Sequence, residues 1–260
     1  MDSRAFDIQK FLEHCFKEKK YIEPASRAEI TKERIFDAID TYSPEVIVKV
    51  GLGTGELLSN IAGHSKGTIV VVEPSLSNIR KYIKEQGESK SLRFIAGDLN
   101  VLPVDYYRAD MVITVDNLSF IESGTAIDEF RRILQFEAIL FISTPVLADG
   151  DEEGALDDYM RILFPLHNEY YMADELKTVL EHKEFSFVKS GLNEFKEPSA
   201  AAADFFCSVY DSDLTAAKDF IGKHKDVFEQ SYKLNAEDYA VSYYSGLFRR
   251  IKPDYAYEKY

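Results

Sequence analysis

Apolar residues recur along the first half of the chain in two alternating patterns. Short apolar runs that indicate buried strands lie at residues 46–50, 68–72, 92–96, 111–115 and 138–143. The segments between them repeat apolar residues every three or four positions, which is the spacing of an amphipathic helix. Strands that are apolar throughout and alternate with helices are typical of a parallel sheet covered on both faces. The pattern therefore predicts an α/β fold.

The segments around this alternating region are less regular. Helical spacing appears at residues 3–18 and 31–40, and after Pro145 we expect an acidic loop (149–158), a helix (173–180), a strand (185–188) and a last strand (241–251). We divide the chain into an N-terminal helical cap (1–42), a core (43–198 and 239–254) and a helical insertion (199–238). The cap and the insertion either form a lid over the site or only complete the core.

Composition narrows the classes of function. The N-terminus has no apolar stretch behind basic residues, and no apolar run is long enough to span a bilayer, so we expect a cytoplasmic protein without a membrane partner. The net charge of −14 disfavours nucleic acid, which is usually bound through a basic stripe. The two cysteines, Cys15 and Cys207, have no metal-ligand spacing, so no metal site is expected. A homodimer is left open.

A glycine-rich turn follows the first predicted strand. The sequence Gly-Leu-Gly-Thr-Gly at residues 51–55 lies between a strand and a helix, where glycines allow backbone to approach a ligand. A dinucleotide fingerprint requires a small third residue, but that position is Glu56, whose charge opposes a pyrophosphate. A phosphate-binding P-loop is excluded because no Gly-Lys-Ser/Thr follows.

Acidic residues end the predicted strands. Glu73 follows the second strand and could accept hydrogen bonds from both hydroxyls of a ribose, while Asp98 follows the third strand, near where an adenine could be recognised. Ligands of open α/β sheets bind beyond the carboxyl ends of the strands. Each residue alone could equally cap a turn. Together they favour an adenosine ligand without phosphate.

The motifs VGLGTGELL, VVEPS, FIAGDLNVLP and ADMVITVDNLSFIE, followed by EFRRIL, resemble those of class I S-adenosylmethionine-dependent methyltransferases. The small-molecule branch is the most similar. The resemblance covers residues 44–145, with a weaker part in YMADELKTVLEHKEFSFV. It implies a Rossmann-like, mostly parallel seven-stranded sheet. It also implies methyl transfer to a small-molecule acceptor, with S-adenosylmethionine as donor and S-adenosylhomocysteine as product.

The same resemblance implies cofactor contacts at named positions. The glycine turn would approach the methionine part and the ribose, the end of the second strand would hold the ribose, the end of the third strand would contact adenine, and the residues after the fourth would flank the methionine. The turn residues are Gly51, Gly53 and Gly55, and those at the end of the second strand are Glu73 and Pro74. Asp98 and Leu99 follow the third strand, and Asp116 and Asn117 follow the fourth.

Lys49 departs from the family pattern. The family usually has an acid two positions before the first glycine, facing the cofactor's ammonium, and a cation about 6 Å away would repel that group by roughly 3 kcal/mol at an effective dielectric constant of about 20. Lys49 could pair with the cofactor's carboxylate, or with Glu122 or another nearby acid. It could also extend to solvent without a role, or indicate a modified cofactor or a degenerate domain. We expect Lys49→Asp to leave S-adenosylmethionine binding equal or tighter.

Catalysis of methyl transfer needs mainly alignment and exclusion of water, with a general base for some acceptors. The sequence FPLHNEYY offers His167 as a base and Tyr170 or Tyr171 to orient the acceptor. Alternatively, His167 is only a packing residue. Two other functions stay open: a degenerate methyltransferase-like binding or regulatory module, and an NAD(P)-dependent oxidoreductase.

Overall fold

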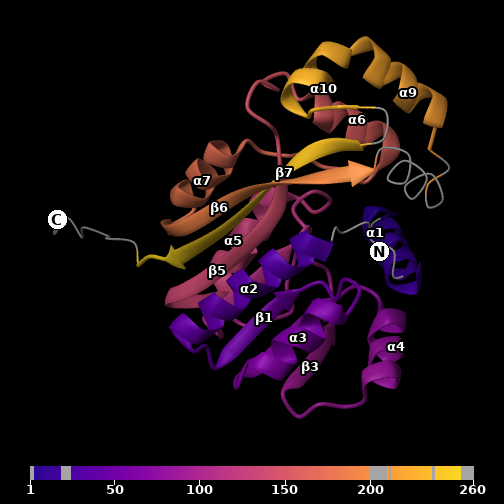
Figure 1. Cartoon of the computed structure of the whole chain (residues 1–260). Helices are drawn as coiled ribbons and strands as arrows, with labels where there is room; N and C mark the ends of the chain where they lie inside the picture. Colours follow the sequence, from indigo (N-terminus) through magenta and orange to yellow (C-terminus); the bar gives the residue numbers. More distant parts are fainter. Residues whose placement is uncertain (1–2, 19–24, 199–209, 211, 236–237, 253–260) are drawn as a thin grey trace.

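The computed structural model describes residues 3–18, 25–198, 210, 212–235 and 238–252 of the chain. Its centre is a seven-stranded sheet with the order β3-β2-β1-β4-β5-β7-β6 (Figure 1). The strands are β1 (Val46–Val50), β2 (Thr68–Glu73), β3 (Leu92–Ala96), β4 (Ala109–Val115), β5 (Leu134–Val146), β6 (Phe185–Pro198) and β7 (Asp238–Arg250). Strands β1 to β5 pair in parallel, and β7 is antiparallel to both of its neighbours. The predicted Rossmann-like, mostly parallel sheet is confirmed.

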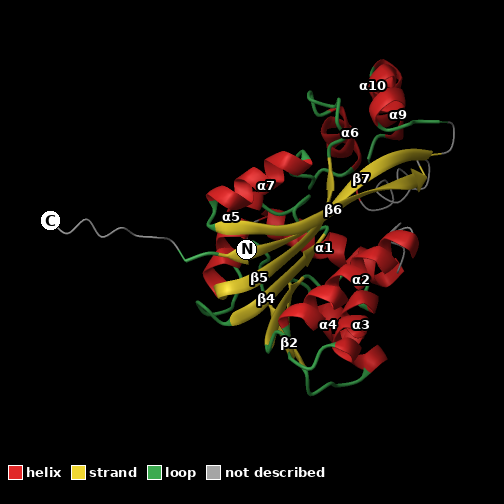
Figure 2. Ribbon diagram, turned by 60° about the vertical axis from the view of Figure 1, so that its left-hand side comes forward, coloured by secondary structure: helices red, strands yellow, loops and turns green. Residues whose placement is uncertain are grey.

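Helices cover both faces of this sheet (Figure 2). They are α1 (Ser3–Glu18), α2 (Ala25–Tyr42), α3 (Glu56–His64), α4 (Leu76–Gln86), α5 (Ser123–Ile133), α6 (Ala155–Leu163), α7 (Ala173–His182), α9 (Leu214–Lys223) and α10 (Lys225–Ser231). Figure 2 shows α2, α3 and α4 on one face and α5 and α7 on the other. None of the helices in the described part of the chain has the length and apolar character that a bilayer span needs.

Alternate residues of each central strand enter different cores. In β1, Ile47 packs among the side chains of α2 and α3, whereas Val48 and Val50 pack on the opposite face with α5. Successive side chains of a strand point to opposite faces, so a strand buried on both sides is apolar at most of its positions. This is why the largely apolar runs in the sequence correctly predicted the strands, although Lys49 of β1 is also buried.

Two predicted boundaries were wrong. Helix α2 begins at Ala25 rather than at residue 31, and part of the expected acidic loop at 149–158 is the start of α6. The carboxylate of Asp151 accepts hydrogen bonds from the backbone N–H groups of Ala155 (2.7 Å) and Leu156 (3.0 Å). Acidic side chains at the start of a helix stabilise it by binding its unpaired N–H groups. The acidic stretch is therefore a loop at residues 149–154, as predicted, and then the start of α6.

Strands β6 and β7 form a long antiparallel pair that extends beyond the rest of the sheet (Figure 2). β6 is longer than the predicted strand at 185–188, because this edge strand is mostly polar after Val188 and so lacks the apolar run by which the buried strands were predicted. Helices α9 and α10 lie between these strands in sequence and contact α6 in the fold. Residues 199–209, 211 and 236–237 of the predicted insertion lie outside the described residues.

Candidate active site

The glycine turn after β1 needs glycine at several positions. Gly51, Gly53 and Gly55 have φ angles of 72°, 62° and 86°, in the left-handed region that other residues rarely adopt. A Cβ atom on Gly55 would lie 2.8 Å from the ring of Tyr82, and one on Gly51 would lie 3.0 Å from Asn117 Oδ1. A Cβ on Gly53 would have nothing within 4 Å. The turn therefore packs closely against Asn117 at Gly51 and against Tyr82 at Gly55, whereas the backbone at Gly53 is uncovered.

The end of β4 meets this turn. Asn117 Nδ2 donates to the carbonyl oxygen of Val50 (3.0 Å) and to Thr114 Oγ1 (3.1 Å), which ties the two strand ends together. Asp116 has a φ of 60°, and its Oδ2 pairs with the guanidinium of Arg27 from α2. Asp116 Oδ1 is buried and has no hydrogen-bond partner among the described residues. Burial raises the pKa of Asp116, and the positive charges of Arg27 and Lys49 oppose that shift.

A cavity of about 100 Å³ lies between α1, the glycine turn and the end of β4. It lies at the carboxyl ends of neighbouring strands, where open α/β sheets bind their ligands. The helix contributes apolar side chains, and the turn and strand ends contribute backbone and polar groups. The lining includes Phe11, Leu12, Cys15, Lys49, Gly51, Gly53, Thr54, Asp116, Asn117 and Phe120.

Glu73, at the end of β2, is fully buried beside this cavity but does not line it. Its Oε2 accepts from the N–H of Leu52 (2.9 Å), and its Oε1 accepts from the N–H of Ser75 (3.1 Å) and from Asn78 Nδ2 (3.3 Å). Burial raises the pKa of Glu73, while these hydrogen bonds and the charge of Lys49 lower it. The carboxylate predicted to hold a ribose is therefore occupied by the protein's own donors.

Helix α1 closes this region from above. Asn78 Nδ2 also donates to the carbonyl oxygen of Leu12 (3.0 Å), and Ser75 Oγ donates to Glu13 Oε1 (2.7 Å). The cavity below α1 is smaller than the roughly 300–1,000 Å³ usual for small-molecule sites. A ligand that reached Glu73 would have to displace α1 or the side chain of Asn78.

The residues predicted to contact adenine lie apart from the cavity. Asp98 is exposed at the end of β3, and its Oδ1 accepts from the N–H (2.8 Å) and Nδ2 (3.1 Å) of Asn100. Leu99 is buried in the core on the α5 side of the sheet, and Pro74 directly follows Glu73. The cavity lining brings together Lys49, Gly51, Gly53 and the end of β4, but does not include Gly55 or these three residues.

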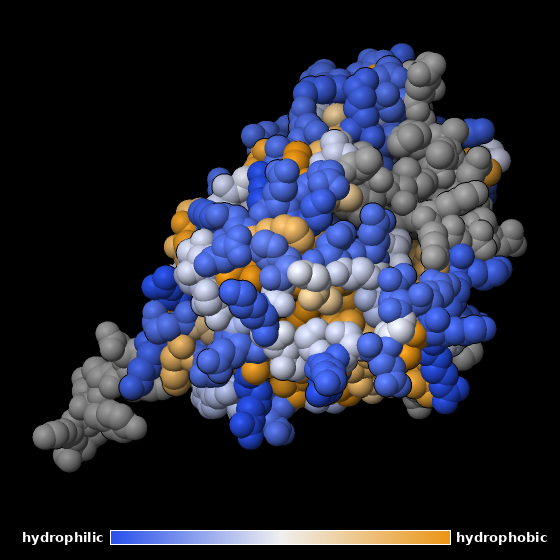
Figure 3. All heavy atoms as spheres, turned by 60° about the horizontal axis from the view of Figure 1, so that its bottom comes forward, coloured by the Kyte–Doolittle hydropathy of each residue, from blue (hydrophilic) through white to orange (hydrophobic). Residues whose placement is uncertain are grey.

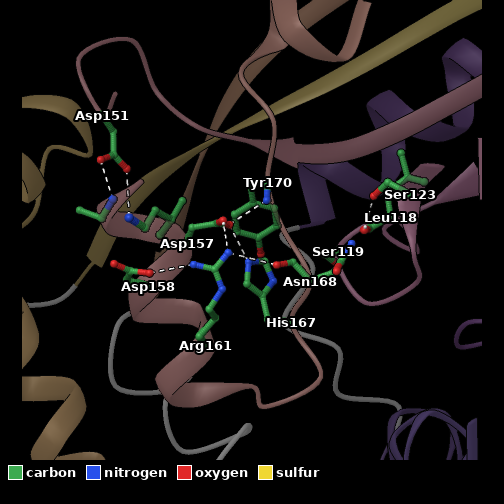
Figure 4. A network of polar contacts seen from close by, with 12 residues as sticks. Leu118, Ser119, Ser123, Asp151, Asp157, Asp158, Arg161, His167, Asn168 and Tyr170 are labelled. Atoms are coloured by element: carbon green, nitrogen blue, oxygen red, sulfur yellow. Dashed lines mark hydrogen bonds and ion pairs between the residues drawn. The ribbon is translucent and has the colours of Figure 1, made fainter. Parts of the chain in front are cut away.

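His167 belongs to a separate polar network (Figure 4). Its side chain is fully buried, and its Nε2 lies 2.7 Å from Asp157 Oδ1, which also accepts from the N–H of Tyr170 (2.7 Å). Tyr171 Oη donates to Glu169 Oε1 (2.6 Å), and burial raises the pKa of both tyrosines. Neither His167 nor Tyr171 is among the described residues that line the cavity.

The same segment is nevertheless joined to the end of β4. The N–H of Asn168 donates to the carbonyl oxygen of Ser119 (2.7 Å), and Asn168 Nδ2 donates to that of Ile121 (3.0 Å) (Figure 4). The loop before α7 therefore packs on the loop after β4, which itself contributes Asp116 and Asn117 to the cavity lining.

Arg27 is a site residue that the sequence analysis missed. It is 2% exposed, pairs with Asp116 and lies 4.0 Å from the ring centroid of Tyr243 on β7. The apolar spacing placed the second helix at 31–40, so Arg27 fell outside every predicted element. A charged residue near a helix start carries no sequence signal of its burial, which depends on contacts with β4 and β7.

The groups around the cavity fit the methionine end of an adenosyl amino acid. The glycine turn offers bare backbone, Asp116 Oδ1 is a buried acceptor, and Arg27 and Lys49 are buried cations that suit a carboxylate. At the ribose end, Glu73 is the appropriate residue type for a diol, but its oxygens are reached only after α1 or Asn78 moves.

Known proteins resemble this chain in sequence and in fold. Residues 47–137 match the family described as a methyltransferase domain. The search of curated proteins gave no match. Solved structures share the fold at low sequence identity. YcgJ from Bacillus subtilis has a TM-score of 0.73 and 11% identity, over 86% of this chain and 100% of that one.

A second similar structure holds the reaction product. The N-methyltransferase NodS from Bradyrhizobium japonicum, in complex with S-adenosylhomocysteine, has a TM-score of 0.57 and 13% identity, over 88% of this chain and 90% of that one. The matched domain contains β1, the glycine turn, Glu73, Asp98 and the end of β4. Residues 47–137 thus form a methyltransferase domain, in a chain with the Rossmann-like fold of class I S-adenosylmethionine-dependent methyltransferases.

Proposed function

We propose that this enzyme transfers the methyl group of S-adenosylmethionine to a small molecule in the cytoplasm. The observation that carries the proposal is the cavity enclosed by α1, the glycine turn and the end of β4. An enclosed site with apolar walls and few polar groups suits a small acceptor. The net charge of −14 argues against RNA as the acceptor.

The proposed roles of the cofactor site follow from position. Gly51 and Gly53 present backbone to the methionine part, with Asp116 and Asn117 beside it. Glu73, with Pro74 next to it, binds the ribose, and Asp98 and Leu99 lie at the strand end nearest to it, where adenine would bind. When bound, the cofactor supplies an activated methyl group, so the protein needs to align the acceptor and exclude water.

Helix α1 is proposed as the lid of this site. Its inner face supplies Phe11, Leu12 and Cys15 to the cavity, and its hydrogen bonds to Asn78 and Ser75 hold it over Glu73. When these bonds break, Glu73 can bind a ribose, and closure over the bound cofactor then excludes water.

His167 is retained as the proposed base. Asp157 binds its Nε2, and its Nδ1 is buried with no hydrogen-bond partner among the described residues (Figure 4). A histidine oriented by a carboxylate has the arrangement of an assisted base. His167→Gln should lower turnover of an acceptor whose hydroxyl or ammonium must lose a proton. The pH dependence should flatten, while S-adenosylhomocysteine affinity stays unchanged. A purely structural role would instead lower stability and leave the pH profile intact.

Calorimetry with S-adenosylhomocysteine tests the cofactor assignment. We expect saturable binding to the wild-type protein, no binding of NADH, and a loss of about tenfold or more in Glu73→Ala, because the ribose hydroxyls lose their acceptor. Asp110→Asn, at the opposite end of β4, is the control and should bind normally. Normal binding by Glu73→Ala would contradict the proposed ribose site.

The acceptor class is tested separately. Formation of S-adenosylhomocysteine is measured with pooled small molecules, with unfolded protein and with RNA. Turnover confined to the small-molecule pool is expected. Turnover confined to protein or RNA would overturn the small-molecule assignment but not the methyltransferase activity.

A further inference from the structure

The inference concerns Lys49, a buried cation in the wall of the cavity. Lys49 lies on β1, is 4% exposed and lines the cavity together with Gly51 and Asp116. Its Nζ donates to the carbonyl oxygen of Gly51 at 2.5 Å. The side chain therefore does not extend to solvent, which removes one interpretation of this residue.

Two buried carboxylates lie close to Lys49. Its positive charge lowers the pKa of both Glu73 and Asp116, so two buried carboxylates lie within its electrostatic reach. A buried ammonium is stable only when it is hydrogen-bonded and accompanied by negative charge. Glu122, the other partner considered from the sequence, is exposed and accepts from the N–H groups of Gly124 and Thr125 at the start of α5.

One cation lines the cavity, and a second lies behind a lining residue. Lys49 donates to the carbonyl oxygen of Gly51, whereas Arg27 pairs with Asp116 and is not part of the lining. A ligand ammonium would have to approach the carbonyl oxygen of Gly51, to which the Lys49 ammonium already donates, so the two positive charges would repel each other. A ligand carboxylate at the same place would instead be attracted by the Lys49 ammonium.

We infer that the Lys49 ammonium takes the place of the ligand's own ammonium. The site then selects adenosyl ligands by the carboxylate of their tail, with the amino group contributing little or opposing binding. Lys49 is thereby a specificity-determining residue. The inference rests on the proposed cofactor site and adds to it the part of the ligand that the site recognises.

The experiment compares three ligands by calorimetry. They are S-adenosylhomocysteine, its analogue without the amino group (S-adenosyl-4-thiobutyrate) and its analogue without the carboxylate (S-adenosyl-3-thiopropylamine). In the wild-type protein we expect the carboxylate analogue to bind at least as tightly as S-adenosylhomocysteine, and about tenfold or more tighter than the amine analogue.

Two variants assign this preference to Lys49. Lys49→Met should narrow the difference between the analogues, and Lys49→Asp should reverse it. Lys66→Met, which neutralises an exposed lysine just before β2, is the matched control and should keep the wild-type order. Thermal unfolding of each variant is measured first. If Lys49→Asp does not fold, Lys49→Met still decides the question.

The outcomes are distinguishable. If S-adenosylhomocysteine binds but loses affinity when its amino group is removed, the inference is wrong and the proposed cofactor site stands. An unchanged preference in Lys49→Met would also overturn it. If none of the three ligands binds, the proposed cofactor site itself fails, and this inference with it.

Discussion

At the scale of single residues, the glycines of the turn after β1 are needed for two different reasons, a positive φ angle and the space that a side chain would take. Gly53 needs only a positive φ, because nothing lies within 4 Å of a Cβ placed there. Gly55 also needs the space, because a Cβ would lie 2.8 Å from the ring of Tyr82. Tyr82 cannot easily yield, since its hydroxyl lies 2.9 Å from Ser59 Oγ and its ring is buried.

We therefore expect Gly53→Ala to lower the free energy of unfolding by about 1 kcal/mol, from backbone strain alone. Gly55→Ala should cost roughly 3 kcal/mol, because overpacking is added to the same strain. Urea denaturation of the two variants without ligand checks this. Equal losses would show that Tyr82 moves aside at little cost.

The residue scale also shows where sequence reasoning reached its limit. Gly51, Asp116 and Asn117 were predicted at the site because they end strands, and strand ends of a parallel sheet share one edge. That Glu73 would be enclosed could not be predicted. Its burial depends on Asn78 and on α1, which is more than fifty residues away in sequence. Local patterns carry no information on such contacts.

At the scale of elements, α1 is held over the site by its inner apolar face and by two hydrogen bonds to α4 and its cap. Cys15 on this face is 5% exposed and lines the cavity, and burial raises the pKa of its thiol to about 12. Because the thiolate is the reactive form, the native thiol should react slowly.

Thiol labelling follows the movement of α1. In a Cys207→Ser variant, Cys15 should react with a disulfide reagent at pH 8 far more slowly than in the urea-unfolded chain. Saturating S-adenosylhomocysteine should slow it further, because the ligand covers the thiol. Faster labelling with ligand would show instead that the cofactor displaces α1.

Helix α5 anchors the segment after β3 through one ion pair. Glu129 accepts from the N–H of Leu102 (2.8 Å) and pairs with Arg132, which donates to the carbonyl oxygens of Leu102 and Val104. The hydrogen bond from Arg132 lowers the pKa of Glu129, and burial only partly opposes it. The carboxylate therefore binds protons less readily in the folded than in the unfolded chain.

This shift has a defined sign. The stability from Glu129 is fully present above the unfolded glutamate pKa of about 4.3, and it is lost as the pH falls through the lower folded value. Glu129→Gln should thus destabilise the protein at pH 7, and this loss of stability should be smaller at pH 3, below the unfolded pKa. Urea titrations at both values measure it. An equal loss at both would assign the effect to packing.

The errors in the predicted bounds of the helices and strands have a common cause. The start of α2, the first turn of α6 and most of β6 are polar, and each is fixed by a tertiary contact or a cap rather than by apolar spacing. Asp151 caps α6 and also accepts a hydrogen bond from Tyr232 at the end of α10 (2.5 Å). The buried parallel strands were predicted correctly because most of their residues are apolar.

At the scale of the whole molecule, charge dominates the surface. The face in Figure 3 is mostly hydrophilic, with apolar side chains scattered among polar ones. A net charge of −14 opposes the compact state through self-repulsion, which salt screens. Most ion pairs among the described residues have at least one exposed partner, and such pairs contribute little.

Raising sodium chloride from about 0.02 M to about 0.5 M should therefore raise the Tm, by roughly 2–4 °C. Choline chloride at equal ionic strength is the control for specific ion effects. A Tm that falls with salt would show that the ion pairs outweigh the repulsion.

The pairing of β6 with β7 has a consequence for how this enzyme can diverge. Pro198 and Asp238 are partners in the ladder, so the chain leaves the sheet and returns to it at adjoining points. Because the ladder already fixes both stems, it sets little limit on the length of the segment between them. The sequence of that segment is constrained only where it packs, since Phe228 and Tyr232 are buried in the core. A longer or shorter segment should therefore be tolerated as long as these two residues keep their contacts.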